Sequence, residues 1–111
     1  MSDEWGVRLE RVGGALLIAP SGELDGEQAD RLRRVLASRE TTYDVVVLDL
    51  RELVRIGPGG VELMRELRER AQRITFVAGP GTRASLSEVG DDLVIEEDLE
   101  QALAPHRAAR S

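Results

Sequence analysis

The sequence predicts an α/β domain: a small mixed β-sheet of four to five strands with about four α-helices, beginning with an antiparallel hairpin. Two observations carry this prediction. The apolar run 45–48 is typical of a central strand that is covered on both faces, and residues 74–78 form another buried strand. The segments between the expected strands place apolar residues at helical spacing. Strand–helix–strand connections of this length form right-handed crossovers between parallel strands.

The first two strands are expected to form the hairpin. Residues 7–10 alternate between apolar and charged side chains, as a half-buried strand does. Gly13-Gly14 supplies a tight turn because glycine reaches positive φ at low cost. The apolar run 15–19 is the second strand, and we expect Pro20 and Gly22 to end it.

A helix over about residues 26–39 follows the hairpin. Asp25 is its expected N-cap, because a carboxylate accepts hydrogen bonds from the free N–H groups of a first turn. The buried strand 45–48 continues into Asp49, whose carboxylate we expect to bond to nearby loop N–H groups. The face of the helix turned toward the core is expected to carry three apolar residues, Ala29, Leu32 and Leu36.

The second half of the chain repeats this alternation. The segment 57–60 breaks the chain before a second helix, and the strand 74–78 follows that helix. Thr82 is the expected cap of a short helix that Gly90 ends. Asp98 caps a last helix after a short strand. The apolar residues at helical spacing in the second helix are Val61, Met64, Leu67 and Ala71.

Length and composition limit the classes of function. A chain of 111 residues with 41% hydrophobic residues is one domain with one core, expected over about 5–104, and a frayed tail over 105–111. Fifteen basic and 21 acidic residues give a net charge of −6, which argues against general nucleic-acid binding. With no Cys and His106 as the single histidine, thiol chemistry, histidine triads and metal or other cofactor sites are not expected.

The sequence shows no targeting or membrane segment. The acidic residues 1–5 are not followed by an apolar signal region. The longest apolar runs, 15–19 and 45–48, are far shorter than the roughly twenty residues that cross a bilayer. We therefore expect a cytoplasmic protein.

The loops after the parallel strands are the expected functional region, because sheets of this kind bind ligands at the carboxyl ends of their strands. These loops are 21–25, 51–60 and 79–82. The first two of these loops contain sequence segments that resemble those of a known protein family. Gly22-Glu23-Leu24-Asp25 resembles a segment of bacterial anti-sigma factor antagonists, which are STAS domains, and residues 45–50 resemble the central strand of that family. Residues 54–61 align with its switch loop, usually Phe-Ile-Asp-Ser-Ser-Gly-Leu.

The resemblance, which continues through Glu100-Gln101-Ala102-Leu103, implies a STAS-like fold and a protein–protein switch. In that family a serine kinase, which is also the anti-sigma factor, phosphorylates the second serine of the loop. The unphosphorylated antagonist binds the kinase and frees the sigma factor for transcription. Phosphorylation adds nearly two negative charges at a helix start and disrupts the interface.

The switch loop is where this sequence departs from the pattern. The Asp of the family falls on Gly57, its first Ser on Pro58 and its phosphorylated Ser on Gly59, while the closing Gly60 is kept. Residues 51–60 hold no Ser, Thr or Tyr. We expect a binding module that is not switched by phosphorylation at this position, either constitutively competent for its partner or diverged toward a scaffold or another ligand.

Candidate partner-binding residues follow from the same resemblance, which implies that the loop and the start of the second helix form the kinase-binding surface. Outside the loop, Ser21 is the phosphoacceptor to watch because it should lie beside the loop. If docking is intact, Gly57→Asp with Gly59→Ser should restore phosphorylation. The candidate partner-binding residues are Glu23, Asp25, Val61, Glu62 and Arg65.

A second class of function stays open. The glycine-rich segments 57–60 and 79–82 could bind a nucleotide or another anion, since free helix N–H groups attract phosphate. Neither matches a phosphate-binding motif, so a tight strand-to-helix turn is the favoured interpretation of both. Arg83 is a candidate charge partner beside the second segment. A scaffold that assembles with larger STAS proteins belongs to this class, whereas an enzyme is not expected because no nucleophile–base pair is visible.

Overall fold

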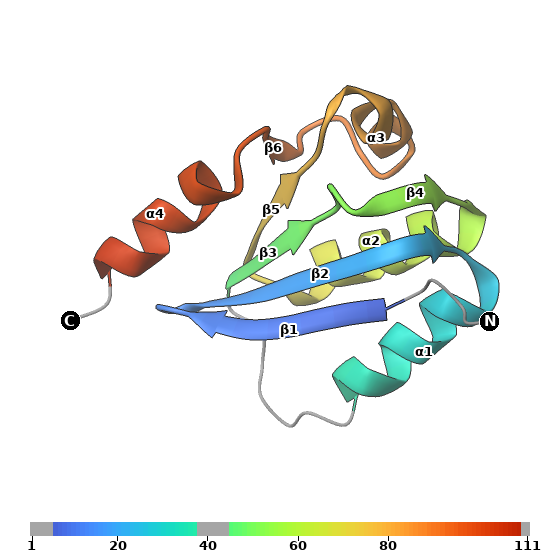
Figure 1. Ribbon diagram of the computed structural model, residues 1–111, viewed down its shortest axis with the longest axis horizontal. Helices are drawn as coiled ribbons and strands as arrows, with labels where there is room; N and C mark the ends of the chain where they lie inside the picture. The colour runs from blue at the N-terminus through green and yellow to red at the C-terminus, as the bar shows by residue number, and fades with distance from the viewer. Residues whose placement is uncertain (1–5, 38–44, 110–111) are drawn as a thin grey trace.

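The computed structural model describes residues 6–37 and 45–109. Within these ranges it contains six strands, four α-helices and a short 3₁₀ helix (Figure 1). Their order and bounds are β1 (Gly6–Val12), β2 (Ala15–Leu24), α1 (Gly26–Ala37), β3 (Val45–Asp49), β4 (Leu53–Ile56), α2 (Pro58–Arg70), β5 (Arg73–Val77), α3 (Pro80–Ser85), η1 (Leu86–Glu88), β6 (Val94–Glu96) and α4 (Leu99–Ala109).

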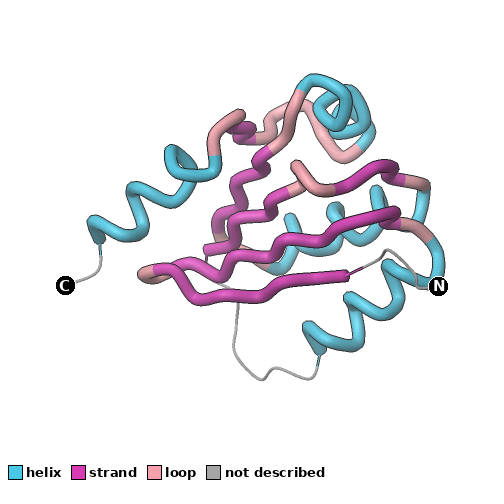
Figure 2. The backbone as a smooth tube through the Cα atoms, in the orientation of Figure 1, coloured by secondary structure: helices cyan, strands magenta, loops and turns pink. Residues whose placement is uncertain are grey.

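The sheet is mixed, as predicted. The strands lie in the order β1-β2-β3-β5-β6, with β1 antiparallel to β2 and the other pairs parallel (Figure 2). The strand β4 lies off this path and pairs in parallel with the carboxyl end of β2. β2 is therefore shared, with β3 along its first half and β4 along its second.

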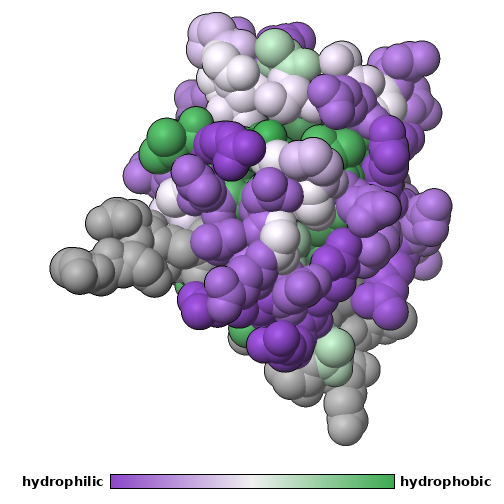
Figure 3. Space-filling model, turned by 90° about the vertical axis from the view of Figure 1, so that its right-hand side faces the viewer, coloured by the Kyte–Doolittle hydropathy of each residue, from purple (hydrophilic) through white to green (hydrophobic). Residues whose placement is uncertain are grey.

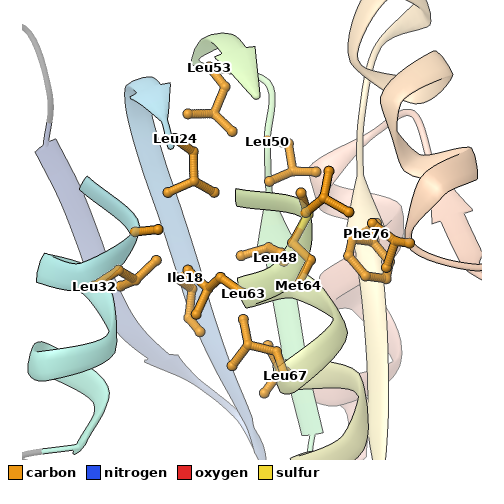
Figure 4. Close-up of a cluster of buried hydrophobic side chains, with 14 of the residues drawn as sticks. Ile18, Leu24, Leu32, Leu48, Leu50, Leu53, Leu63, Met64, Leu67 and Phe76 are labelled. Carbon is orange, nitrogen blue, oxygen red and sulfur yellow. The ribbon is translucent and has the colours of Figure 1, made fainter. Parts of the chain in front are cut away.

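Helices cover both faces of the sheet, which confirms that the central strands are buried on two sides. Alternate residues of β2 point to opposite faces: Leu16 and Ile18 pack under α1 and α2, while Ala15 and Leu17 pack toward α4. Figure 4 shows the first of these cores, with Phe76 of β5 among its fully buried side chains. The helix residues predicted for this core, Ala29, Leu32, Leu36, Val61, Met64, Leu67 and Ala71, are all buried.

Two expectations about the strands were wrong. β2 does not end at Pro20 but continues to Leu24. Pro20 lies between the stretch of β2 that pairs with β3 and the stretch that pairs with β4, where a residue without an N–H is tolerated because pairing on one side is interrupted. The short strand β4 was expected to be loop, because Leu53 is its single buried side chain and its pattern is too short to detect.

The helices of the second half also differ from expectation. The helix α3 begins at Pro80 after Gly79, so Thr82 lies inside it and does not cap it. The helix α1 is described to Ala37, and the last two residues of its expected range lie outside the described residues. None of the helices in the described part of the chain has the length and apolar composition needed to cross a membrane.

The last helix extends further than predicted. Asp98 caps α4 as expected, its carboxylate accepting a hydrogen bond from the Glu100 N–H at 2.9 Å. The helix then continues through Pro105 to Ala109, across residues expected to be frayed. The end of the helix packs on the β1–β2 turn, where Gly13 approaches the backbone of His106, and Arg107 pairs with Glu100. These contacts hold the helix together after the proline.

Candidate functional site

The candidate site lies where β2 and β4 end side by side. Because the two strands are parallel, Leu24 and Ile56 are partners in register, and each strand leads directly into a helix. The residues that follow, Asp25 after β2 and the glycine loop (Gly57–Gly60) after β4, are therefore brought together. The sequence predicted both segments as candidates, and the structure shows that they are in contact.

The Asp25 carboxylate links the starts of two helices. Its Oδ1 atom accepts a hydrogen bond from the Gly59 N–H at 2.7 Å and from the Gly26 N–H at 2.9 Å. Gly26 is the first residue of α1, whereas Gly59 is the second residue of α2. A carboxylate at a helix N-terminus also interacts favourably with the helix dipole. Asp25 therefore caps α1 as predicted and, in addition, caps α2, which the sequence did not reveal.

The glycine loop approaches Asp25 too closely for side chains. A Cβ atom at Gly57 would lie 2.1 Å from Asp25 Oδ2, and one at Gly59 would lie 2.7 Å from the Gly26 nitrogen. At Gly60 it would lie 2.3 Å from the Leu24 carbonyl oxygen. The Gly57 N–H also donates to that carbonyl, at 3.0 Å. The glycines are thus required by packing, and the loop is a tight strand-to-helix turn.

The remaining candidate residues are distributed between surface and core. Glu23 and Glu62 are exposed, and Glu23 forms a 3.7 Å ion pair with Arg55 of β4. Arg65 is exposed, but its guanidinium donates to the Glu88 carbonyl and ties α2 to η1. Val61 is 6% exposed and packs in the core, because it lies on the same helix face as the apolar residues one and two turns later. Val61, predicted to contact the partner, therefore lies beneath the surface at the start of α2.

Ser21 faces a different environment from the glycine loop. Its hydroxyl donates to the Gly6 carbonyl at 3.4 Å, and it lines a surface hollow with Asp49 and Arg51. The buried Asp49 carboxylate accepts hydrogen bonds from the Arg51 N–H at 3.1 Å and from its guanidinium at 2.9 and 3.0 Å. The loop N–H bond expected for Asp49 is thus confirmed. The side-chain hydrogen bond to Asp49 raises the pKa of Arg51, while partial burial opposes the shift.

The second glycine segment, 79–82, lies apart from Asp25. Gly79 precedes the short helix α3, and Arg83 forms a 3.6 Å ion pair with Glu97. Among residues 6–37 and 45–109, no group of three or more His, Cys, Asp or Glu side chains could hold a metal ion. A residue that sequence reasoning missed is Val54 of β4, which is 85% exposed. The available signal was the group of β-branched or apolar residues Leu53, Val54 and Ile56.

The hairpin, the parallel crossovers and the helix that starts at the glycine loop define a small α/β domain with a mixed sheet. A model of the STAS domain family matches residues 7–78. This match spans more than half of the chain, so the protein belongs to the STAS domain family. A comparison with curated protein sequences gave no match.

Solved structures share the fold at low sequence identity. An anti-sigma factor antagonist from Mycobacterium paratuberculosis is 24% identical with a TM-score of 0.79, covering 93% of this chain and 94% of that one. The anti-sigma factor antagonist SpoIIAA in its unphosphorylated form is 15% identical with a TM-score of 0.73, covering 94% and 99%. An uncharacterised protein with a SpoIIAA-like fold from Shewanella loihica is 18% identical with a TM-score of 0.63, covering 96% and 98%.

Removing the Asp25 carboxylate is expected to destabilise the fold. The Asp25→Ala variant leaves the Gly59 N–H without its cap, and loss of an N-cap costs about 1 kcal/mol. Urea unfolding should show this loss, and hydrogen exchange should accelerate at the Gly59 amide. Glu23→Ala is the matched control, because it removes a nearby carboxylate that forms an exposed ion pair. Equal unfolding free energies for the two variants would contradict the assignment of Asp25 as a cap of α2.

Proposed function

We propose that this protein is a cytoplasmic regulatory binding module of the anti-sigma factor antagonist type that is not switched by phosphorylation at the usual loop position. Its partner is an anti-sigma factor with serine kinase activity or another STAS-type regulatory protein. Membership in the STAS family and the structural likeness to two anti-sigma factor antagonists support this proposal. Its role is binding rather than catalysis.

The observation that carries the proposal is the packing of the glycine loop against Asp25. Gly59 stands where the resemblance places the phosphorylated serine, and it has no hydroxyl. A Cβ atom at this residue would lie 2.9 Å from Asp25 Oδ1 and closer still to the Gly26 backbone. The site therefore presents bare backbone at the residue where a kinase would need a hydroxyl.

The proposed docking surface is built from the exposed residues around this loop. Glu23, Pro58 and Glu62 are exposed at the ends of β2 and β4 and at the start of α2. Figure 3 shows this end of the molecule, where the surface is mostly hydrophilic in its lower half. Beneath the surface, Asp25 fixes the position of α2 against α1 through hydrogen bonds to both helix starts. A partner that docks here meets a surface whose shape is set before binding.

Incubation with candidate anti-sigma kinases and ATP should leave the glycine loop unmodified. The expected result is complex formation with a kinase and no phosphate between Arg51 and Val61, because those residues offer no hydroxyl. Mass spectrometry locates any phosphate, and size-exclusion chromatography detects the complex. An antagonist that carries a loop serine and is a substrate of each kinase shows that the kinase is active. A phosphate mapped to this segment would overturn the proposal.

The binding half of the experiment has its own matched pair. Glu62→Arg reverses a charge at the start of α2, and Glu69→Arg makes the same change near the end of that helix. Both side chains are exposed. We expect Glu62→Arg to weaken the complex about tenfold, which corresponds to about 1.4 kcal/mol, and Glu69→Arg to leave it unchanged. Equal affinities would place docking elsewhere on the molecule.

A further inference from the structure

A second surface feature lies beside the glycine loop. A groove of about 340 Å³ runs between β4 and the start of α3, with Leu53, Val54, Arg55 and Ile56 on one side and residues 79–82 on the other. It lies between two separate parts of the fold, because β4 pairs with β2 whereas α3 follows β5 along the chain. Figure 3 shows hydrophobic side chains at the surface in a band below the top of this end of the molecule.

The strand that forms one wall of the groove is an edge strand. Among the described strands, β4 pairs with β2 and with no other. The Val54 side chain is 85% exposed, the largest exposure of any large hydrophobic residue in the described ranges. An exposed strand edge with an apolar side chain is a template for pairing with an extended segment of another chain.

The charges in the groove have one sign. The charged side chains that line it are Arg51 and Arg55. Their carboxylate partners, Asp49 and Glu23, are not part of the lining. The chain as a whole carries a net charge of −6, so a groove lined by arginines contrasts with the rest of the molecule. An acidic ligand matches this lining.

The glycines of the groove differ from those of the glycine loop. A Cβ atom at Gly79 or Gly81 would meet no atom within 4 Å, and neither residue has a positive φ. Packing and backbone conformation therefore do not require glycine at these positions. Their bare backbone leaves space in the groove for an incoming chain.

We infer that this groove binds an extended acidic segment of the partner protein, with an apolar residue of that segment against Val54 and its carboxylates against Arg51 and Arg55. The inference rests on the proposed function in one respect: the groove is continuous with the proposed docking surface, since Ile56 lines it and Gly57 follows directly. The groove thus extends that surface and accounts for an exposed valine on an edge strand.

A peptide titration followed by NMR tests the inference. The probe is a short synthetic peptide in which glutamate alternates with valine, and its counterpart carries lysine in place of glutamate. The acidic peptide is expected to shift the amide signals of residues 53–56 and of Gly79, Gly81 and Thr82, and the basic peptide is not. Because no kinase is present, failure of this titration leaves the phosphorylation result standing, and a phosphate on the glycine loop leaves the titration standing.

One substitution blocks the groove while keeping the fold. Gly81→Glu places a carboxylate among the arginines at an exposed position in the first turn of α3, where an acidic residue is favourable. Replacing glycine at an ordinary φ also reduces the entropy of the unfolded chain. Gly14→Glu is the matched control, since it makes the same change at another open glycine in the β1–β2 turn.

We expect Gly81→Glu to weaken binding of the acidic peptide at least about tenfold and Gly14→Glu to bind as the unmodified protein does. The inference is overturned if the acidic peptide shifts no signals at millimolar concentration or if the two peptides bind equally. Shifts confined to residues outside the groove, or equal binding by Gly81→Glu, would also overturn it.

Discussion

Introducing the usual switch residues by Gly57→Asp with Gly59→Ser is expected to lower the free energy of unfolding by about 3 kcal/mol. Each new Cβ atom enters occupied space, at 2.1 Å from Asp25 Oδ2 for Gly57 and at 2.7 Å from the Gly26 nitrogen for Gly59. Overpacking costs about 1–3 kcal/mol at each site, and the new carboxylate lies against that of Asp25. Urea unfolding monitored by circular dichroism measures the loss.

This result changes what the double substitution reports. On the sequence alone, the double substitution tests kinase docking, because it should restore phosphorylation if the docking surface is intact. Because the new Cβ atoms meet Asp25, we expect the double substitution also to displace Asp25 from the start of α2, so a lack of phosphate on this variant would not show that docking has diverged. The serine becomes a fair substrate test when the variant is shown to be folded under the assay conditions.

A third substitution separates the two causes of destabilisation. Adding Asp25→Gly removes the three atoms that lie nearest to a Cβ at residue 57, while the contact of residue 59 with Gly26 remains. We expect the triple variant to recover about 1–2 kcal/mol relative to the double variant. If the double variant is as stable as the unmodified protein, the glycine loop does not pack against Asp25 as described.

The second large effect is expected in the β1–β2 turn. Gly13→Ala should lower the free energy of unfolding by about 3 kcal/mol. Gly13 has a φ of 59°, which disfavours alanine by about 1 kcal/mol or more, and a Cβ atom there would lie 2.1 Å from the His106 carbonyl oxygen. The turn must move away from α4 to relieve this contact. Thermal unfolding gives the loss, and hydrogen exchange along α4 shows where it falls.

The neighbouring glycine provides the control. A Cβ atom at Gly14 would meet no atom within 4 Å, and Gly14 does not have a positive φ. Gly14→Ala is therefore expected to leave stability unchanged or to raise it by about 0.5 kcal/mol through the unfolded state. Equal losses at Gly13 and Gly14 would show that the turn tolerates no substitution and that contact with α4 is not the cause.

The sequence predicted the central fold well because its signals are local. The apolar runs of β3 and β5 and the helical spacing in α1 and α2 are visible in short windows. Features set by tertiary contact were not visible. Pro20 reads as a strand end, although the gap between the pairings of β3 and β4 with β2 accommodates it. Pro105 reads as a helix end, although packing on Gly13 stabilises α4 beyond it.

The sequence predicted which segments form the candidate site but not how these segments contact one another. The resemblance of their sequence segments to a known family identified both the glycine loop and Asp25 as candidates. The missing hydroxyl followed from the residues of the loop alone. That Asp25 bonds to the Gly59 N–H depends on β2 and β4 pairing in parallel, and β4 was expected to be loop. The helical spacing of Val61 predicted that it is buried, as the structure shows, whereas the family resemblance predicted that it contacts the partner.

The glycine at residue 59, at the start of α2, also determines which quantities can control binding. A phosphate is added and removed, so a switched antagonist reports the ratio of kinase to phosphatase activity. Gly59 has no hydroxyl to modify, so the charge beside this helix start is the fixed carboxylate of Asp25, which is held by hydrogen bonds to two helices. Under the proposed function, occupancy of the partner then follows concentration and affinity. Such a protein acts as a titrant: its dose is set by synthesis and degradation, and its response is as slow as its turnover.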